Sequence, residues 1–210
     1  MMPNSPTTVR TNTTPDSIKV VQLRAVTFEE LWDAYPSGNP YDNPAYTNQC
    51  AIRMSVALHR VGIEMKSFSS KLVKPLGGQP SIGRILLNGK AAATRASELG
   101  AWLRLQPFAG LGRTENISGP DWESRIKGRT GIVMFDGYWI REGETAANAS
   151  GGHIDLWNGS RMPINGFWSS VSTIGRHIGI SSFRQGTSVL PDVSYSDLSK
   201  SKLILFWEIR

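Results

Sequence analysis

The chain has 210 residues, of which 40% are hydrophobic and 19% are charged, so it can bury a sizeable core within one domain. Its formal net charge of +6 at pH 7 favours contact with an anionic partner. The basic residues are scattered, so we do not expect nucleic-acid binding. No apolar run approaches the roughly 20 residues that membrane insertion requires.

The first part of the chain is polar, rich in Thr and Pro, and without periodicity. We therefore expect residues 1–17 to form a flexible N-terminal tail and residues 18–210 to form a single domain. The tail lacks the apolar segment of a secretory signal, so we expect no export by the signal-peptide route. Residues 20–26 predict a short strand, and Thr27 with Glu30 has the pattern of a capping box that opens a helix through Ala34.

The only cysteine, Cys50, lies at the junction between a loop and a predicted helix. Residues 36–44, before it, are rich in Pro, Gly and Asn, which is typical of a loop. After it, apolar residues recur at helical spacing until Gly62 can end the helix. Thr47 and Asn48 are both suitable N-cap residues. We therefore expect Cys50 to lie in the first turn of this helix.

A helix N-terminus has a chemical consequence for a thiol. Unsatisfied N–H groups and the positive end of the helix dipole stabilise an anion, and a thiolate is such an anion. This favours Cys50 as a nucleophile. The alternative is that Cys50 is a small buried apolar residue, which is the common fate of a free cysteine. A partner base would decide between the two.

The remaining elements predict an α+β domain. Helices dominate the first half of the chain and strands the second, which is typical of an antiparallel sheet with helices packed on one side. Apolar periodicity predicts a helix at residues 90–105, and residues 121–127 indicate a helical turn or a short helix. Strands are expected at residues 131–135, which residues 137–140 would continue, at residues 153–157, where the pattern alternates, and at residues 203–209.

Three histidines compete for the role of base. His59 lies nine residues after Cys50 on the same predicted helix, about 13 Å along its axis, and cannot reach the thiol. His177 lies in a segment without a clear pattern. His153 opens a predicted strand directly after two glycines, which let other groups approach the backbone closely. A histidine far from the cysteine in sequence and at the start of a core strand suits a thiol–imidazole pair, so we favour His153.

A third group should orient the imidazole by accepting a hydrogen bond from its second ring nitrogen. Asp155 shares a strand face with His153, but such neighbours lie about 6–7 Å apart along a strand. Asn165 follows a predicted turn, from which an adjacent strand could return beside His153. Asp136 and Asp192 are weaker candidates. The choice between Asp155 and Asn165 stays open at this point.

The proposed chemistry also needs donors for an oxyanion, and these can come from the chain itself. The backbone N–H of Cys50 and the side-chain amide of Gln49 or Asn48 are candidates, although either amide can instead serve as a cap or loop residue. We expect no cofactor, because the sequence has no phosphate-binding glycine loop, no CxxC pair and no HExxH motif.

Two segments resemble a known family. Residues 48–55, NQCAIRMS, and 152–159, GHIDLWNG, are similar to motifs of the type VI secretion amidase effectors of family four. The resemblance implies a papain-like cysteine peptidase fold related to NlpC-like cell-wall peptidases, with Cys50 as nucleophile and His153 as base. The third member in this family is usually an aspartate beyond the histidine strand. Residues 161–165 contain none, so Asn165 or Asp155 would take that role.

The same resemblance implies a substrate, a secretion route and a protein partner. The substrate would be the amide between D-glutamate and meso-diaminopimelate in peptidoglycan stem peptides. The protein would be made in the producer's cytoplasm, leave through the type VI secretion apparatus without a signal peptide, act in a rival's periplasm and bind a cognate immunity protein. Two alternatives remain: another Cys–His acyltransferase or peptidase, or a non-catalytic basic module that binds cell wall and buries Cys50.

Overall fold

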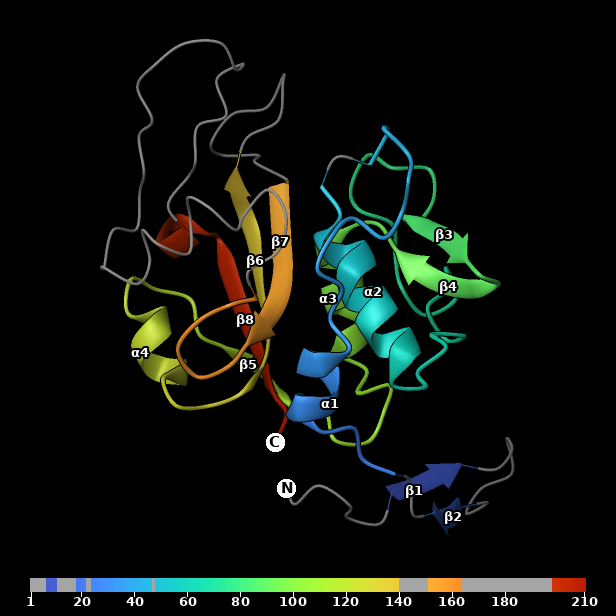
Figure 1. The fold of residues 1–210 in the computed structure, drawn as a ribbon, viewed down its shortest axis with the longest axis horizontal. Helices are drawn as coiled ribbons and strands as arrows, with labels where there is room; N and C mark the ends of the chain where they lie inside the picture. Colours follow the sequence, from blue (N-terminus) through green and yellow to red (C-terminus); the bar gives the residue numbers. More distant parts are fainter. Residues whose placement is uncertain (1–6, 11–17, 22–23, 47, 140–150, 164–197) are drawn as a thin grey trace.

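The structure is a computed structural model that describes residues 7–10, 18–21, 24–46, 48–139, 151–163 and 198–210. Within these residues no helix has the length and apolar character that crossing a membrane demands. The elements (Figure 1) are β1 (Thr7–Arg10), β2 (Ile18–Val21), α1 (Phe28–Asp33), α2 (Cys50–Arg60), β3 (Arg84–Leu87), β4 (Lys90–Ala93), α3 (Ala96–Leu103), β5 (Thr114–Asn116), α4 (Trp122–Ile126), β6 (Gly131–Trp139), β7 (Gly151–Trp157), the 3-10 helix η2 (Leu198–Lys200) and β8 (Leu203–Glu208).

The described strands form three antiparallel sheets, which confirms the predicted α+β class. The largest has the order β5-β8-β6-β7, and β1 with β2 and β3 with β4 form two separate pairs. Helices α1, α2 and α3 lie on one side of the four-stranded sheet, whereas α4 lies on the other (Figure 1). The expectation that all helices pack on one side was therefore wrong for α4, because both faces of this sheet carry large apolar side chains that need cover.

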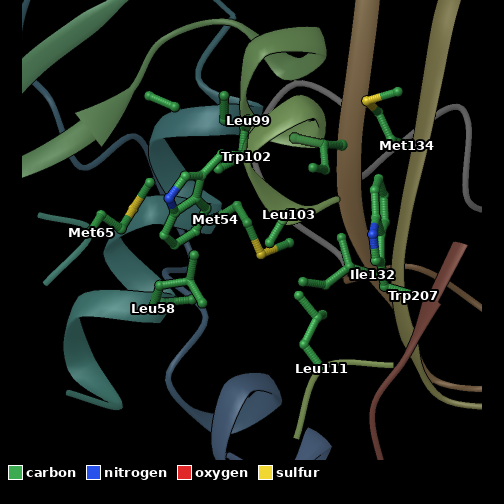
Figure 2. Packing of buried hydrophobic residues seen from close by; sticks show 14 of the residues in the cluster. Met54, Leu58, Met65, Leu99, Trp102, Leu103, Leu111, Ile132, Met134 and Trp207 are labelled. Carbon is green, nitrogen blue, oxygen red and sulfur yellow. The ribbon is translucent and has the colours of Figure 1, made fainter. Parts of the chain in front are cut away.

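Alternation along β6 divides these side chains between two clusters. Ile132 and Met134 join the helices α2 and α3, whereas Val133 and Phe135 join α4 on the opposite face. The first cluster is the larger. Figure 2 shows its close packing between helices and sheet, with the labelled side chains Met54, Leu58, Met65, Leu99, Trp102, Leu103, Leu111, Ile132, Met134 and Trp207. This packing fixes where α2 lies relative to the sheet.

Several predicted elements are confirmed. The capping box forms: Glu30 N–H donates to Thr27 Oγ1, and Thr27 N–H donates to the Glu30 carboxylate. The short helix near residue 121 is α4, and the strands near residues 131, 153 and 203 are β6, β7 and β8. The strand expected at residues 20–26 is β2, which begins and ends earlier, and β1 lies within residues 1–17. The flexibility of that segment stays a prediction.

The single helix predicted at residues 90–105 was wrong. Its first part is strand β4, and only Ala96–Leu103 forms a helix. Asn88 and Gly89 have φ values of 50° and 77°, which are typical of the tight turn that joins two antiparallel strands. This turn pairs β3 with β4, and Ala93 N–H donates to Ser55 Oγ on α2. Turn geometry and packing thus override the helical preference of the alanines.

The capping box gives a test of local stability. Replacing Thr27→Ala removes the acceptor for Glu30 N–H, and we expect a loss of about 1 kcal/mol in the free energy of unfolding, measured by urea denaturation. Thr27→Ser keeps the hydroxyl and should unfold like the wild type. Equal stability of the alanine variant and the wild type would show that the cap contributes nothing.

Candidate active site

Cys50 is the first residue of α2, as the sequence predicts, and its side chain is buried. Its backbone N–H donates to Asn48 Oδ1 at 3.3 Å. The N-cap, however, is Gln49 and not Asn48, which was one of the two predicted caps. The other, Thr47, lies outside the described residues. The thiol therefore occupies the helix N-terminus, where backbone N–H groups favour an anion.

Gln49 has a structural role that explains why it precedes the helix. Its Nε2 donates to the carbonyl oxygens of Tyr41 and Tyr46 at 2.6 and 3.1 Å, and its Oε1 accepts from Tyr41 N–H at 3.1 Å. The buried amide thereby ties the preceding loop to the start of α2. Both amide hydrogens are used by these carbonyls, so Gln49 is not available to an oxyanion, contrary to one of our predictions.

His153 lies on β7, the edge strand of the described sheet, and the residue is 1% exposed. Figure 1 shows that β7 is the strand of this sheet nearest to α2. Imidazole Nε2 lies 3.3 Å from Asp155 Oδ2, and the Cys50 side chain is near enough to the ring to influence its pKa. Phe135, its partner across the ladder, stacks on the imidazole with 6.5 Å between ring centroids.

Two opposing effects set the protonation of His153. Burial disfavours the charged imidazolium, but hydrogen bonds to Asp155 and Cys50, together with their negative charges, raise the pKa of His153 to about 9. The imidazolium form of His153 is therefore favoured at neutral pH. This is the charge arrangement that a thiolate–imidazolium nucleophile requires.

The structure brings Asp155, rather than any other described candidate for the third member, against the imidazole. Its Oδ2 contacts His153, and its Oδ1 accepts from Leu156 N–H at 2.9 Å, so both carboxylate oxygens are occupied. Side chains in a strand lean along its direction, which lets neighbours two residues apart meet despite the spacing of their Cα atoms. Asn165, the rival candidate, lies outside the described residues, as do Asp192 and His177.

The other candidates within the described residues, His59 and Asp136, have different contacts. His59 Nε2 lies 2.8 Å from the carbonyl oxygen of Ala91, where it joins α2 to β4, and burial lowers the pKa of His59. Asp136 pairs with Gly152 across the ladder, and burial raises the pKa of Asp136. The rejection of His59 on distance agrees with this placement.

Sequence reasoning missed two buried polar neighbours of the site. The Tyr35 hydroxyl is buried beside the Asp155 carboxylate, in a contact that falls short of ordinary hydrogen-bond geometry. Burial first, and then Asp155, raises the pKa of Tyr35 well above its usual value, while the charge of Arg53 acts in the opposite direction. No sequence pattern indicates this role for Tyr35.

Arg53 lies one turn after Cys50 and is 3% exposed. Its Nη2 donates to Asn39 Oδ1 at 2.9 Å, and its buried Nε has no hydrogen-bond partner among the described residues. Arginine is seldom buried to this extent without a carboxylate. The sequence did carry a signal here, because Arg53 shares a helix face with Cys50 and Ala57, which are both small and apolar.

A cleft of about 450 Å³ opens beside the thiol. Cys50, Asn48 and Gly152 lie on its wall, and a Cβ atom added at Gly152 would stand 3.3 Å from Ala96 Cβ. A side chain at this glycine would therefore narrow the cleft. The lining residues that the structure describes are Ala45, Tyr46, Asn48, Cys50, Leu76, Ser81, Ile82, Gly83, Arg84, Thr94, Arg95, Ala96, Ser97 and Gly152. A thiol–imidazole–carboxylate group beside such a cleft can perform acyl transfer on a bound peptide.

Comparison with solved structures finds effectors of the type VI secretion system. The chain resembles the type VI effector Tae4 from Enterobacter cloacae with 16% identity and a TM-score of 0.48, over 88% of this chain and 96% of that one. It resembles Tae4 from Salmonella typhimurium, crystallised with the immunity protein Tai4 from Enterobacter cloacae, with 16% identity and a TM-score of 0.46, over 87% and 98%. It also resembles the Tae4–Tai4 complex from Salmonella Typhimurium, with 20% identity and a TM-score of 0.43, over 65% of this chain and 84% of that one.

Comparison with curated proteins finds no match. The family model for amidase effector protein 4 of the type VI secretion system (Tae4) matches residues 46–207, a span that includes Cys50, His153 and Asp155. Because this match covers well over half of the chain, the protein belongs to the Tae4 family of type VI secretion amidase effectors.

Proposed function

We propose that this protein is a cysteine amidase of papain-like fold that hydrolyses the amide between D-glutamate and meso-diaminopimelate in peptidoglycan stem peptides. The observation that carries the proposal is the buried group of Cys50, His153 and Asp155 beside an open cleft. Membership in an amidase effector family supports the reaction class. The net charge of +6 supports an anionic polymer such as cell wall as the substrate.

In the first half of the reaction Cys50 is the nucleophile. His153 Nδ1 holds the thiol proton, and the thiolate sulfur attacks the carbonyl carbon of the scissile amide. A C–S bond forms as the carbonyl π electrons move to the oxygen. The imidazolium then gives its proton to the amide nitrogen, the C–N bond breaks and the amine leaves. Asp155 keeps Nε2 of the ring oriented throughout.

In the second half, water releases the acyl group. His153, now neutral, takes a proton from a water molecule whose oxygen attacks the acyl carbon. The C–S bond breaks, the thiolate is restored beside the imidazolium, and the product leaves as a carboxylic acid, which loses its proton to the solvent.

The oxyanion formed in both halves needs donors near the sulfur. The Cys50 backbone N–H is one candidate, and the side-chain amide of Asn48, which is exposed and lines the cleft, is the other. In the structure Asn48 Oδ1 accepts from this same N–H. Stabilisation of the oxyanion by Cys50 N–H therefore requires the Asn48 side chain to turn when substrate binds.

The cellular role follows from the family. A type VI secretion effector is delivered by that apparatus, and we propose that this one is made in the producer's cytoplasm and acts in the target cell's periplasm, where peptidoglycan lies. Tae4 proteins from Salmonella and Enterobacter have been crystallised with Tai4 immunity proteins. We propose that a cognate immunity protein also binds this chain and protects the producer.

The mechanism predicts the effect of removing the thiol or the base. Cys50→Ala and His153→Gln should each lower release of peptide fragments from purified sacculi by at least roughly 1,000-fold, because the nucleophile or its base is lost. His59→Gln is the matched histidine control and should keep activity, since His59 binds Ala91 instead.

Mass spectrometry of the products separates the alternatives. Hydrolysis adds one water to the cleaved peptide, whereas an acyltransferase would leave the acyl group on another amine. Fragment release by a well-folded Cys50→Ala protein would refute the mechanism.

The role of Asp155 predicts a change in the titration of His153. Asp155→Asn removes the negative charge that helps to raise the imidazole pKa, so the pKa of His153 should fall from about 9. Activity should fall at least about tenfold, because the ring is less firmly oriented. NMR titration of the imidazole protons measures the shift, with the exposed Asp33→Asn as a control for lost charge. An unchanged His153 titration would exclude Asp155 as its partner.

A further inference from the structure

The cleft beside Cys50 has a positive character. Its described lining includes two arginines, Arg84 and Arg95, and no carboxylate. A carboxylate on a bound peptide would therefore meet no negative side chain in this lining. Whether the cleft can recognise such a group depends on which arginine has a guanidinium free to bind it.

Arg95 is already engaged by the protein. Its Nη1 donates to Glu98 Oε1 and to the carbonyl oxygen of Ser81, both at 2.9 Å, and its Nη2 donates to Gln79 Oε1 at 2.8 Å. Glu98 is 2% exposed and balances the charge of Arg95. The Glu98 carboxylate also accepts from the backbone N–H groups of Leu76 and Gly83, so this ion pair holds the loop that forms one wall of the cleft.

Arg84 differs from Arg95 in having its binding edge free. It is the first residue of β3 and is exposed. Its Nε donates to the carbonyl oxygen of Phe68 at 3.1 Å, which anchors the guanidinium at one side. Among the described residues, none forms a hydrogen bond or ion pair with its two Nη groups. Two parallel N–H groups of this kind match the two oxygens of a carboxylate.

The backbone around Arg84 is also fixed. Arg84 pairs with Ala93 in the β3–β4 ladder, and Thr94 N–H donates to the carbonyl oxygen of Gly83 at 2.8 Å. A Cβ atom at Gly83 would lie 2.4 Å from Thr94 Oγ1, so the two segments approach as closely as a glycine allows. Arg84 thus projects from a firmly held strand, which reduces the entropy lost when it binds a ligand.

We propose that Arg84 binds a free carboxylate of the substrate peptide close to the scissile amide and so determines specificity. This inference rests on the proposed function for its substrate. In the stem peptide two carboxylates qualify: the α-carboxylate of D-glutamate, which is free because this residue is linked through its side chain, and the unlinked carboxylate of diaminopimelate. Both present the same chemistry to a guanidinium, and amidation of either one removes its charge while keeping its size.

The experiment compares matched peptides with matched variants. The peptides are the unmodified stem tetrapeptide, in which diaminopimelate has one unlinked carboxylate, and two forms in which one carboxylate is replaced by a carboxamide, first on D-glutamate and then at that unlinked position of diaminopimelate. Wild-type protein should cleave one amidated form roughly 10- to 100-fold less efficiently, mainly through a higher KM, because a charge-assisted interaction is lost. The Arg84→Gln variant should cleave the unmodified peptide as poorly as the wild type cleaves that amidated form. It should no longer distinguish the unmodified peptide from that amidated form. The amidated position that matters identifies the carboxylate.

Two further variants separate recognition from general charge. Arg84→Lys keeps the charge but loses the paired N–H groups, so its discrimination should be intermediate. Arg113→Gln makes the same change in net charge at an exposed residue outside the cleft lining and should behave like the wild type. If Arg84→Gln lowers cleavage of all three peptides by the same factor, or of none, Arg84 does not bind a carboxylate.

Binding to the Cys50→Ala protein, measured by NMR titration with the same peptides, makes the test independent of catalysis. If the wild type cleaves no peptide but the carboxylate still governs binding through Arg84, the proposed reaction fails and the recognition site stands. If cleavage occurs with no effect of Arg84 on binding or on discrimination, the recognition site fails and the reaction stands.

Discussion

The packing of α2 against strand β7 is the contact on which the candidate site depends. Met54 and Leu58 on the helix share one buried cluster with Ile154 and Leu156 on the strand. This packing fixes the start of α2 beside the edge strand, and that is where the Cys50 thiol meets the imidazole. Because protein interiors are close-packed, a change in these apolar side chains would move the thiol and the imidazole relative to one another. The core therefore helps to set the geometry of the candidate site.

The buried charges of the site are compensated by other charges within the protein. His153 and Asp155 are 1% and 4% exposed, and an isolated charge at such depth would be costly. The imidazolium and carboxylate compensate one another, while Arg53 adds a buried positive charge that acts on Tyr35 at the edge of the same group. At the cleft, the buried Glu98 likewise neutralises the charge of Arg95 and stabilises the loop that lines the cleft. Arg84, in the same lining, can therefore direct its positive charge to a ligand.

Local sequence patterns predicted much of the fold. The segment of α2 has a helical period and that of β7 alternates, whereas β6 and β8 are short continuous apolar runs typical of strands covered on both faces. The Thr27 capping box forms as expected. The same patterns placed Cys50 at a helix start and His153 on a distant strand, and the structure brings the two together. The β3–β4 hairpin was missed although its turn residues, Asn88 and Gly89, were a visible signal, because the alanines that follow favour a helix by propensity.

The sequence by itself therefore determined the pair of side chains that form the candidate site and the elements that carry them, because residue spacing and helix-end chemistry are local properties. Only the tertiary structure decided which groups surround that pair. Spacing along a strand suggested that Asp155 is too distant from His153, yet its side chain leans to the imidazole. The Gln49 side chain hydrogen bonds to the preceding loop. Tyr35 lies beside Asp155 although the two residues are far apart in the sequence. Such contacts depend on side-chain direction and on packing between remote segments, which no local pattern records.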